Sequence, residues 1–309
     1  MIHRFRRVIS AFIVGIAIAT LGYTSAYAAT NPSQAITLSP ASTEFTIDPG
    51  GSGADKVTII NGGGESFNVA LSSAPYHVEG DNYDPQFTQL PGTVDASAWV
   101  HLSTLNGTVA GNKTLTVPYT IDVPKSTVPG GYYAVIFATT STDDIKTGVV
   151  SHNRVGNVLY ITVNGTIKSG GKLTGDPLPS FYFAGAIPIG TKITNGGGTH
   201  FITKAVYTVT DLSGKEVFNS TTERYILPQT EREISSNWTP QGLFNVFTVH
   251  RNATVAGNNE SLPDRKIVFI NPWLIVVAAF IIGFLIGIPF KRARQRRQGE
   301  KSEAKERKP

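Results

Sequence analysis

The histidines of this chain do not form a pattern typical of a catalytic or metal-binding site. Five follow the N-terminal segment and lie far apart, namely His77, His101, His152, His200 and His250. The sequence has no cysteine, no His-Glu-x-x-His motif and no Gly-x-Ser-x-Gly motif, which zinc sites and serine hydrolases use. We therefore expect a protein that is not an enzyme and needs no cofactor.

Two short motifs match known chemistry only in letters. Ser169–Lys172 fits the Ser-x-x-Lys pattern of some hydrolases, but it lies in a polar linker and lacks the companion motifs. Leu227–Glu231 differs by one residue from a sortase sorting signal and lies well before the C-terminal apolar run instead of next to it. The hypothesis of an exported wall-active enzyme therefore has no motif behind it.

The segment from residue 76 to residue 87 is the one candidate binding loop. Aromatic faces on an exposed loop stack on sugar rings or insert into a protein partner. The acidic residues between them are Ca²⁺ ligands by type, although their spacing is not that of an EF-hand. The alternative is that the aromatic rings simply cover a sheet edge. The candidate ligand residues are Tyr76, His77, Tyr83 and Phe87, and the candidate calcium ligands are Glu79, Asp81 and Asp84.

The elements that must position this loop are β-strands. Between residues 36 and 270 strand-forming residues are frequent, Gly and Pro recur as turn signals, and no helical apolar period is present. Half-buried strands are predicted by alternation at Leu115–Val123 and Phe201–Val209, and central strands by apolar runs at Gly131–Ala138 and Val158–Val163. Asp211–Gly214 predicts a hairpin turn. Many short strands of this kind favour an all-β ectodomain of Ig-like β-sandwiches.

Three further residues give expectations about packing. Trp99 and Trp238 are expected in the core or against a sheet edge. Pro118 takes an outward position in a predicted strand and cannot donate a ladder hydrogen bond, which indicates an edge strand or a bulge.

The strand pattern repeats once along the chain. Val57–Gly64 and Lys192–Gly198 each predict a strand that ends in Asn-Gly-Gly-Gly, a turn expected to need positive φ. We infer two tandem Ig-like sandwiches, at 29–167 and 168–270, with a polar linker after residue 167. The first is enlarged by an insertion at 72–98.

The N-terminus has the three parts of a signal peptide. Arg4, Arg6 and Arg7 precede an apolar run, and Ala26-Tyr27-Ala28 fits the cleavage pattern. We expect a signal peptide over residues 1–28, with cleavage after Ala28 or Ala29. An uncleaved anchor is the alternative.

The C-terminus predicts a membrane anchor. Pro272–Phe290 contains no charged residue and at about 1.5 Å per residue covers about 28 Å, close to the hydrocarbon thickness of a bilayer. Trp273 lies where an interfacial aromatic residue belongs, and the tail 291–309 opens with Lys291, Arg292 and Arg294. By the positive-inside rule this arrangement is a single-pass type I protein of the cell membrane, with a basic cytoplasmic tail. No stalk separates the second sandwich from residue 272, so that sandwich is expected to lie against the membrane.

The charge of the chain belongs to its two ends. The formal net charge is +5, but the basic residues of the signal segment and the tail account for it, and the body between them is mildly acidic. A mildly acidic body has no electrostatic footprint for DNA or RNA, so we expect no nucleic-acid partner.

The first predicted sandwich resembles a known bacterial module. Ile36–Pro40, Asp48–Gly50, the Asn61 turn, Trp99–Leu102 and Pro129–Tyr133 occur in this order in the peptidoglycan-binding domain of the WxL-interacting protein family. They are similar more broadly to membrane-anchored Ig-like surface proteins of bacteria. The resemblance implies a non-enzymatic role in binding cell-wall polymer and a partner surface protein, and it transfers no binding residue. A single-pass receptor or an accessory subunit of a membrane complex is the alternative function.

Overall fold

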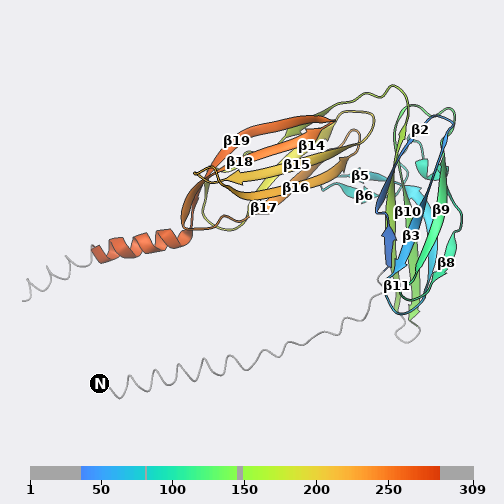
Figure 1. Cartoon of the computed structure of the whole chain (residues 1–309), viewed down its shortest axis with the longest axis horizontal. Helices are drawn as coiled ribbons and strands as arrows, with labels where there is room; N and C mark the ends of the chain where they lie inside the picture. The colour runs from blue at the N-terminus through green and yellow to red at the C-terminus, as the bar shows by residue number, and fades with distance from the viewer. Residues whose placement is uncertain (1–35, 81, 145–148, 286–309) are drawn as a thin grey trace, which may run out of the picture.

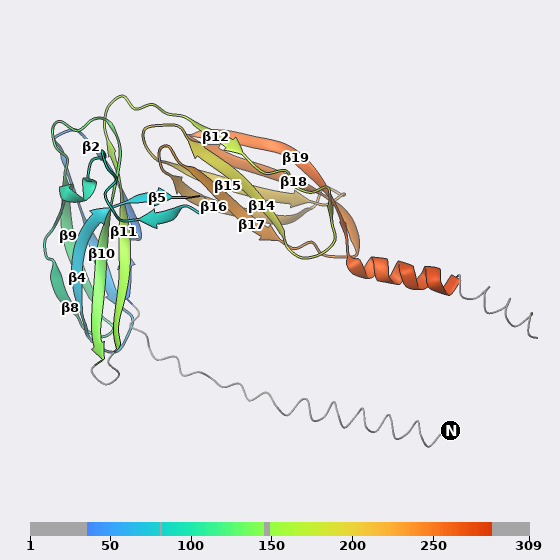
Figure 2. The same ribbon diagram turned by 180° about the vertical axis from the view of Figure 1, so that it is seen from behind.

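The computed structural model describes residues 36–80, 82–144 and 149–285. The predicted signal peptide and the basic tail with Lys291, Arg292 and Arg294 lie outside these residues. Figures 1 and 2 show two elongated β units, here called the first unit (36–163) and the second unit (171–270). The predicted all-β, sandwich-like architecture of the body is confirmed.

The first unit has two sheets, in the strand orders β1-β3-β9-β7 and β2-β11-β10-β4-β8. The four-stranded sheet consists of β1 (Ile36–Ser39), β3 (Ser52–Asn61), β9 (Thr114–Asp122) and β7 (Val100–Leu102). The five-stranded sheet consists of β2 (Ser42–Ile47), β11 (Val149–Val163), β10 (Gly130–Asp144), β4 (Phe67–Pro75) and β8 (Asn106–Val109). Between β4 and β7 the chain forms a hairpin of β5 (His77–Glu79) and β6 (Asp84–Gln86), then the 3₁₀ helix η1 (Ala96–Trp99).

The second unit has a three-stranded sheet, β12-β14-β17, and a five-stranded sheet, β13-β19-β18-β15-β16. The smaller sheet consists of β12 (Gly171–Thr174), β14 (Ile187–Asn195) and β17 (Glu231–Trp238). The larger sheet consists of β13 (Phe181–Tyr182), β19 (Asn258–Ile270), β18 (Phe244–Val255), β15 (Phe201–Thr210) and β16 (Glu216–Ile226).

The larger sheets of the two units have the same topology, position for position. In both, the outer strand that comes first in sequence runs parallel to its neighbour, as β2 does to β11 and β13 to β19. The other pairings in these two sheets are antiparallel. The hairpin β5–β6, η1 and β7 of the first unit have no counterpart among the described residues of the second. The repeat seen in the sequence therefore reflects a repeat of topology.

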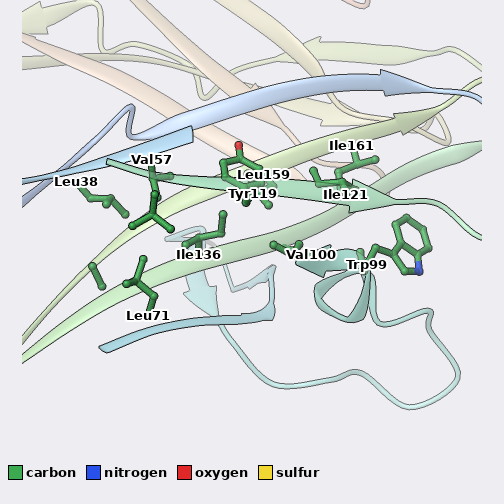
Figure 3. Packing of buried hydrophobic residues seen from close by; sticks show 14 of the residues in the cluster. Leu38, Val57, Leu71, Trp99, Val100, Tyr119, Ile121, Ile136, Leu159 and Ile161 are labelled. Atoms are coloured by element: carbon green, nitrogen blue, oxygen red, sulfur yellow. The ribbon is translucent and has the colours of Figure 1, made fainter. Parts of the chain in front are cut away.

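Each unit closes over its own core, because alternate residues of the facing sheets point inward. In β9 the inward positions are Val117, Tyr119 and Ile121, as the alternation predicts. Figure 3 shows Tyr119 and Ile121 of this strand beside Ile136, Leu159 and Ile161 of the opposite sheet, with Trp99 at one end. Trp99 and Trp238 are both 5% exposed, so the expectation that they pack in the core is confirmed.

Pro118 does not mark an edge strand, because β9 lies between β3 and β7. Pro118 lies where the pairing of β7 with β9 ends. Ser103, the residue just after β7, donates a backbone hydrogen bond to the Pro118 carbonyl (3.0 Å). The nitrogen of Pro118 faces the same side and has no proton to return. The strand β7 ends at Leu102, and the proline occupies the end of that ladder instead of the edge of the sheet.

The two Asn-Gly-Gly-Gly turns join equivalent strands, and in each the asparagine side chain holds the turn together. The Asn61 Oδ1 accepts from the Gly63 N–H (2.9 Å), and the Asn195 Oδ1 accepts from the Gly197 N–H (2.8 Å). The Nδ2 groups of both donate to nearby backbone carbonyls. The expectation of positive φ is wrong, because none of the turn glycines has it. At Gly197 the requirement is space: a Cβ there would lie 2.9 Å from the Lys168 carbonyl oxygen.

A helix over residues 272–285 follows β19 and leaves the second unit at the end opposite the first unit (Figure 1). Residues 286–290 of the predicted anchor lie outside the described part of the chain. Within that part, no helix is both long enough and apolar enough to cross a membrane.

Replacing Asn195 with alanine is expected to lower the free energy of unfolding by about 2–3 kcal/mol, because the buried Gly197 N–H and two carbonyls lose their partner. Urea denaturation followed by tryptophan fluorescence measures this change. Asn219→Ala, at an exposed position of β16, is the control and is expected to change little. Equal effects from both variants would show that the turn does not depend on the Asn195 side chain.

Candidate functional site at the junction of the two units

The hairpin β5–β6 reaches from the first unit to the second (Figure 2). Its tip is a tight turn in which Gly80 and Tyr83 both have positive φ, 70° and 61°. Positive φ is uncommon for a residue with a large side chain, and residues in such strained conformations are often found at functional sites. Here the turn directs the ring of Tyr83 away from its own sheet and into the second unit.

Tyr83 is the central contact of the junction. It is 8% exposed, and its hydroxyl accepts a hydrogen bond of 2.6 Å from the backbone N–H of Leu227. The hydroxyl also lies 3.2 Å from the Thr230 Oγ1. Because the Thr230 hydroxyl itself donates to the Leu227 carbonyl, Tyr83 is the donor to Thr230. The guanidinium carbon of Arg232 lies 4.3 Å from the centre of the Tyr83 ring, a cation–π contact.

A second group of rings joins the sheets themselves. Tyr160 of β11 stacks on Tyr225 of β16, with ring centres 3.9 Å apart and planes 17° apart. The ring of His200 lies against both of them and against Tyr133. The Tyr133 hydroxyl accepts from the backbone N–H of His200 (2.9 Å). Stacked and edge-to-face rings of this kind stabilise an interface beyond the area they bury.

Backbone hydrogen bonds fix the linker as well. The Gly131 N–H donates to the Gly198 carbonyl (2.9 Å), across the junction. The Gly198 N–H in turn donates to Lys168 (2.9 Å), and the Gly196 N–H to Gly170 (3.0 Å). A side chain at Gly131 would not fit without rearrangement, since a Cβ there would overlap the Tyr133 hydroxyl and lie 3.0 Å from the Cα of Thr199. The segment predicted as a polar linker is thus bonded to the Asn195 turn.

The other predicted ligand residues lie around the base of the hairpin. Tyr76 and Phe87 contact each other with ring centres 6.2 Å apart. Phe87 packs edge-on against Phe137, whose face is covered by the guanidinium of Arg154 at 3.4 Å. His77 lies 3.1 Å from the carboxylate of Glu79. The structure therefore brings Tyr76 and Phe87 together and sends Tyr83 into the second unit. Ligand binding by this segment stays a prediction.

The predicted calcium ligands are only partly described. Glu79 and Asp84 lie opposite each other in the hairpin, and Asp81 lies outside the described residues. Over the described parts of the chain, no group of three or more His, Cys, Asp and Glu residues is placed to hold a metal ion. Calcium binding stays a prediction.

A groove of about 640 Å³ runs along the junction beside the hairpin. This volume lies in the range of small-molecule and cofactor sites. None of its described lining residues is a lysine, arginine, aspartate or glutamate. Aromatic and aliphatic side chains form much of its wall, and amides and hydroxyls form the rest. The first group includes Tyr76, Leu90, Val94, Val128, Tyr132 and Leu227, and the second Thr88, Gln89, Gln229 and Thr230, with His77 at the hairpin.

A second hollow, of about 310 Å³, lies on the three-stranded sheet of the second unit. Its lining includes Lys192 and Asp176, which form an ion pair (3.3 Å), and Glu233. It is half the size of the junction groove and contains none of the residues that the sequence singles out for binding. The junction groove is therefore the better candidate site.

Burial sets the protonation of the junction. It raises the pKa of Tyr76, Tyr83, Tyr133 and Tyr160, so these rings stay neutral. Burial lowers the pKa of His200, against a smaller opposing effect of Glu44. It also lowers the pKa of Arg232, which remains charged because arginine starts so high.

Sequence reasoning missed the receiving side of the junction. The segment Leu227–Glu231, set aside as an incomplete sorting signal, is the loop that receives Tyr83. His200, Tyr225 and Arg232 carried no signal in the sequence, because each is an isolated residue: His200 lies in the turn before β15, Tyr225 on β16 and Arg232 on β17.

No family model matches the chain, and no curated protein matches it. Solved structures similar to it include the class 5 fimbriae chaperone CfaA (7% identity, TM-score 0.38, covering 76% of this chain and 98% of that one) and the E. coli chaperone DraB (13%, 0.37, 75% and 98%). The PapD-like domain 7 of human CEP192 is also similar (19%, 0.31, 44% and 89%). At such low identities and TM-scores the likeness carries no argument for function.

Tyr83→Phe is expected to lower the free energy of unfolding by about 1–3 kcal/mol, because the buried Leu227 N–H loses its acceptor. Chemical denaturation measures the change. Tyr182→Phe, which removes a hydroxyl bonded to the Ala186 carbonyl at an exposed position, is the matched control. A loss no larger than that of the control would contradict the central role of Tyr83.

The stability of the junction is expected to fall with acidification. Because burial lowers the pKa of His200, the unfolded chain binds a proton more readily than the folded chain below about pH 6.5. The stability that neutral His200 contributes is fully present above about pH 6.5 and is lost as the pH falls through the lowered pKa. His200→Gln should flatten this dependence, measured as free energy of unfolding between about pH 7.5 and pH 5.5. An unchanged slope would remove His200 as its source.

Proposed function

We propose that this chain is a non-enzymatic, membrane-anchored surface protein whose junction groove binds a neutral segment of cell-wall polymer. The observation that carries the proposal is the groove itself, which is lined by tyrosines, aliphatic side chains and amides without a formal charge from Lys, Arg, Asp or Glu. A glycan offers such a wall both apolar C–H faces, which pack on aromatic rings, and hydroxyls, which bond to amides and backbone groups.

The way the two units are joined supports binding at this place. Groups on either side of the junction are fixed by hydrogen bonds, by stacked rings and by a short bonded linker. A groove between rigidly joined walls does not have to be ordered when a ligand binds, so less of the interaction free energy is lost. The resemblance of residues 36–165 to the peptidoglycan-binding domain of the WxL-interacting protein family points to the same ligand class.

The helix after β19 supports the anchor. Its apolar side chains are exposed on all sides, Phe280 by 76%, and a helix that is apolar all round is buried in a protein core or in a membrane. The uncharged sequence continues to Phe290 and the cationic tail follows. In this proposal the signal segment exports the body, and both units lie outside the cytoplasmic membrane.

Charging the groove is expected to reduce binding to purified peptidoglycan sacculi. Val128→Asp places a carboxylate on the rim at a position that is 69% exposed, so folding is expected to be unaffected. An unpaired charge facing a neutral ligand costs on the order of 1–3 kcal/mol, or roughly a tenfold loss of affinity. Co-sedimentation of the full-length protein in detergent with sacculi measures this.

Leu105→Asp is the matched control, because Leu105 is 58% exposed on the same unit and does not line the groove. The expected result is equal retention of the wild type and Leu105→Asp, and roughly tenfold weaker binding of Val128→Asp. Absence of retention of the wild type would overturn wall binding. In that case cross-linking of the groove to another surface protein would favour the second ligand class that the resemblance implies.

A further inference from the structure

The exposed large apolar side chains of the second unit gather at one end. Seven are exposed among its described residues, and six of these lie at the end from which the helix leaves, the exception being Ile202. We call this end the base. The most exposed are Leu212 (77%), Phe181 (59%), Leu243 (57%) and Phe244 (56%), and Phe183 and Val217 complete the set.

Strand pairings place these residues around the start of the helix. Phe181 pairs with Val268 and Phe244 with Ile270, so both flank the last residues of β19. The Leu243 carbonyl accepts from the Asn271 N–H (2.8 Å), and the Asn271 side chain accepts from the Trp273 N–H (3.0 Å). Thr210 pairs with Thr248 of β18, which directs the hairpin that carries Leu212 toward the same end. Figures 1 and 2 show this end facing away from the junction.

Two of the three loops of the base are free of charge, whereas the hairpin that carries Leu212 contains Asp211 and Lys215. Residues 181–186 and 239–243 contain no Lys, Arg, Asp or Glu. Contiguous exposed apolar surface is rare on soluble proteins and marks an interaction site. Aromatic residues are enriched where protein meets the interface between lipid and water, and uncharged loops enter that layer at little desolvation cost.

We infer that the base of the second unit inserts its apolar loop tips into the headgroup layer of the bilayer, around the point where the helix enters. This inference rests on the proposed membrane anchor. Insertion of these loops would fix the orientation of the second unit on the membrane, instead of leaving the unit free to rotate about Asn271. The partner is the lipid surface, because an apolar helix begins between Phe181 and Phe244, and the two loops on either side of it carry no charge for a polar partner.

The absence of cysteine from the sequence allows single labels at chosen sites. Full-length protein is reconstituted in vesicles of phosphatidylethanolamine and phosphatidylglycerol, with an environment-sensitive fluorophore at Phe280→Cys, Leu243→Cys or Leu105→Cys. We expect the labels on the helix and the base to shift to shorter wavelength and to be quenched by nitroxide-bearing lipids. The label at Leu105 on the first unit should show neither effect.

The three labels separate the two ideas. A label at Phe280 that stays in water would overturn the anchor on which the inference rests. A label at Phe280 in lipid, together with a label at Leu243 as accessible to water as that at Leu105, would overturn insertion of the base.

A charge variant tests the patch without touching the helix. Leu212→Asp/Leu243→Asp should strongly reduce the quenching of a label at Phe181→Cys, since the anionic phosphatidylglycerol headgroups repel carboxylates and a carboxylate costs free energy where it approaches the hydrocarbon. Leu105→Asp is the control and should leave the quenching as in the wild type. Quenching that survives the double substitution would also overturn the inference.

Discussion

The insertion of Tyr83 into the second unit is the contact on which the arrangement of the protein depends. Two sandwiches joined by a short segment would ordinarily move relative to each other, because interfaces between domains of one chain are small and polar. Here a buried hydroxyl satisfies the Leu227 N–H, a guanidinium covers the ring, and stacked tyrosines continue the contact between the sheets. These interactions hold the two units in one relative orientation.

The groove exists because of that geometry. One wall comes from the hairpin and the neighbouring loops of the first unit, and the other from the loop that receives Tyr83. Neither unit alone presents both walls. The insertion that distinguishes the first sandwich from the second therefore has a structural role, because it holds the junction. Its first residues, Tyr76 and His77, also line the candidate site.

The two ends of the second unit differ in chemistry, although its strands run without interruption between them. The junction end presents His200, Tyr225 and Leu227 to the first unit, and their side chains are buried or partly buried there. The base presents uncovered apolar loop tips around the start of the helix. In the proposed membrane arrangement, a rigid second unit with these two different ends sets the direction in which the groove faces.

The sequence by itself determined the local structure: the all-β body, the alternating strands such as β9, the hairpin at Asp211, the buried tryptophans and the repeat marked by Asn61 and Asn195. These follow from periodicity and turn chemistry within a few residues. Only the tertiary structure decided the place of Pro118 inside a sheet, the absence of positive φ in the glycine turns, and the junction. Tyr83 and Leu227 are 144 residues apart, and no local pattern records which loop a hairpin tip will meet. The sequence singled out residues 76–87, but the surface that this segment meets depends on how two separate cores come together.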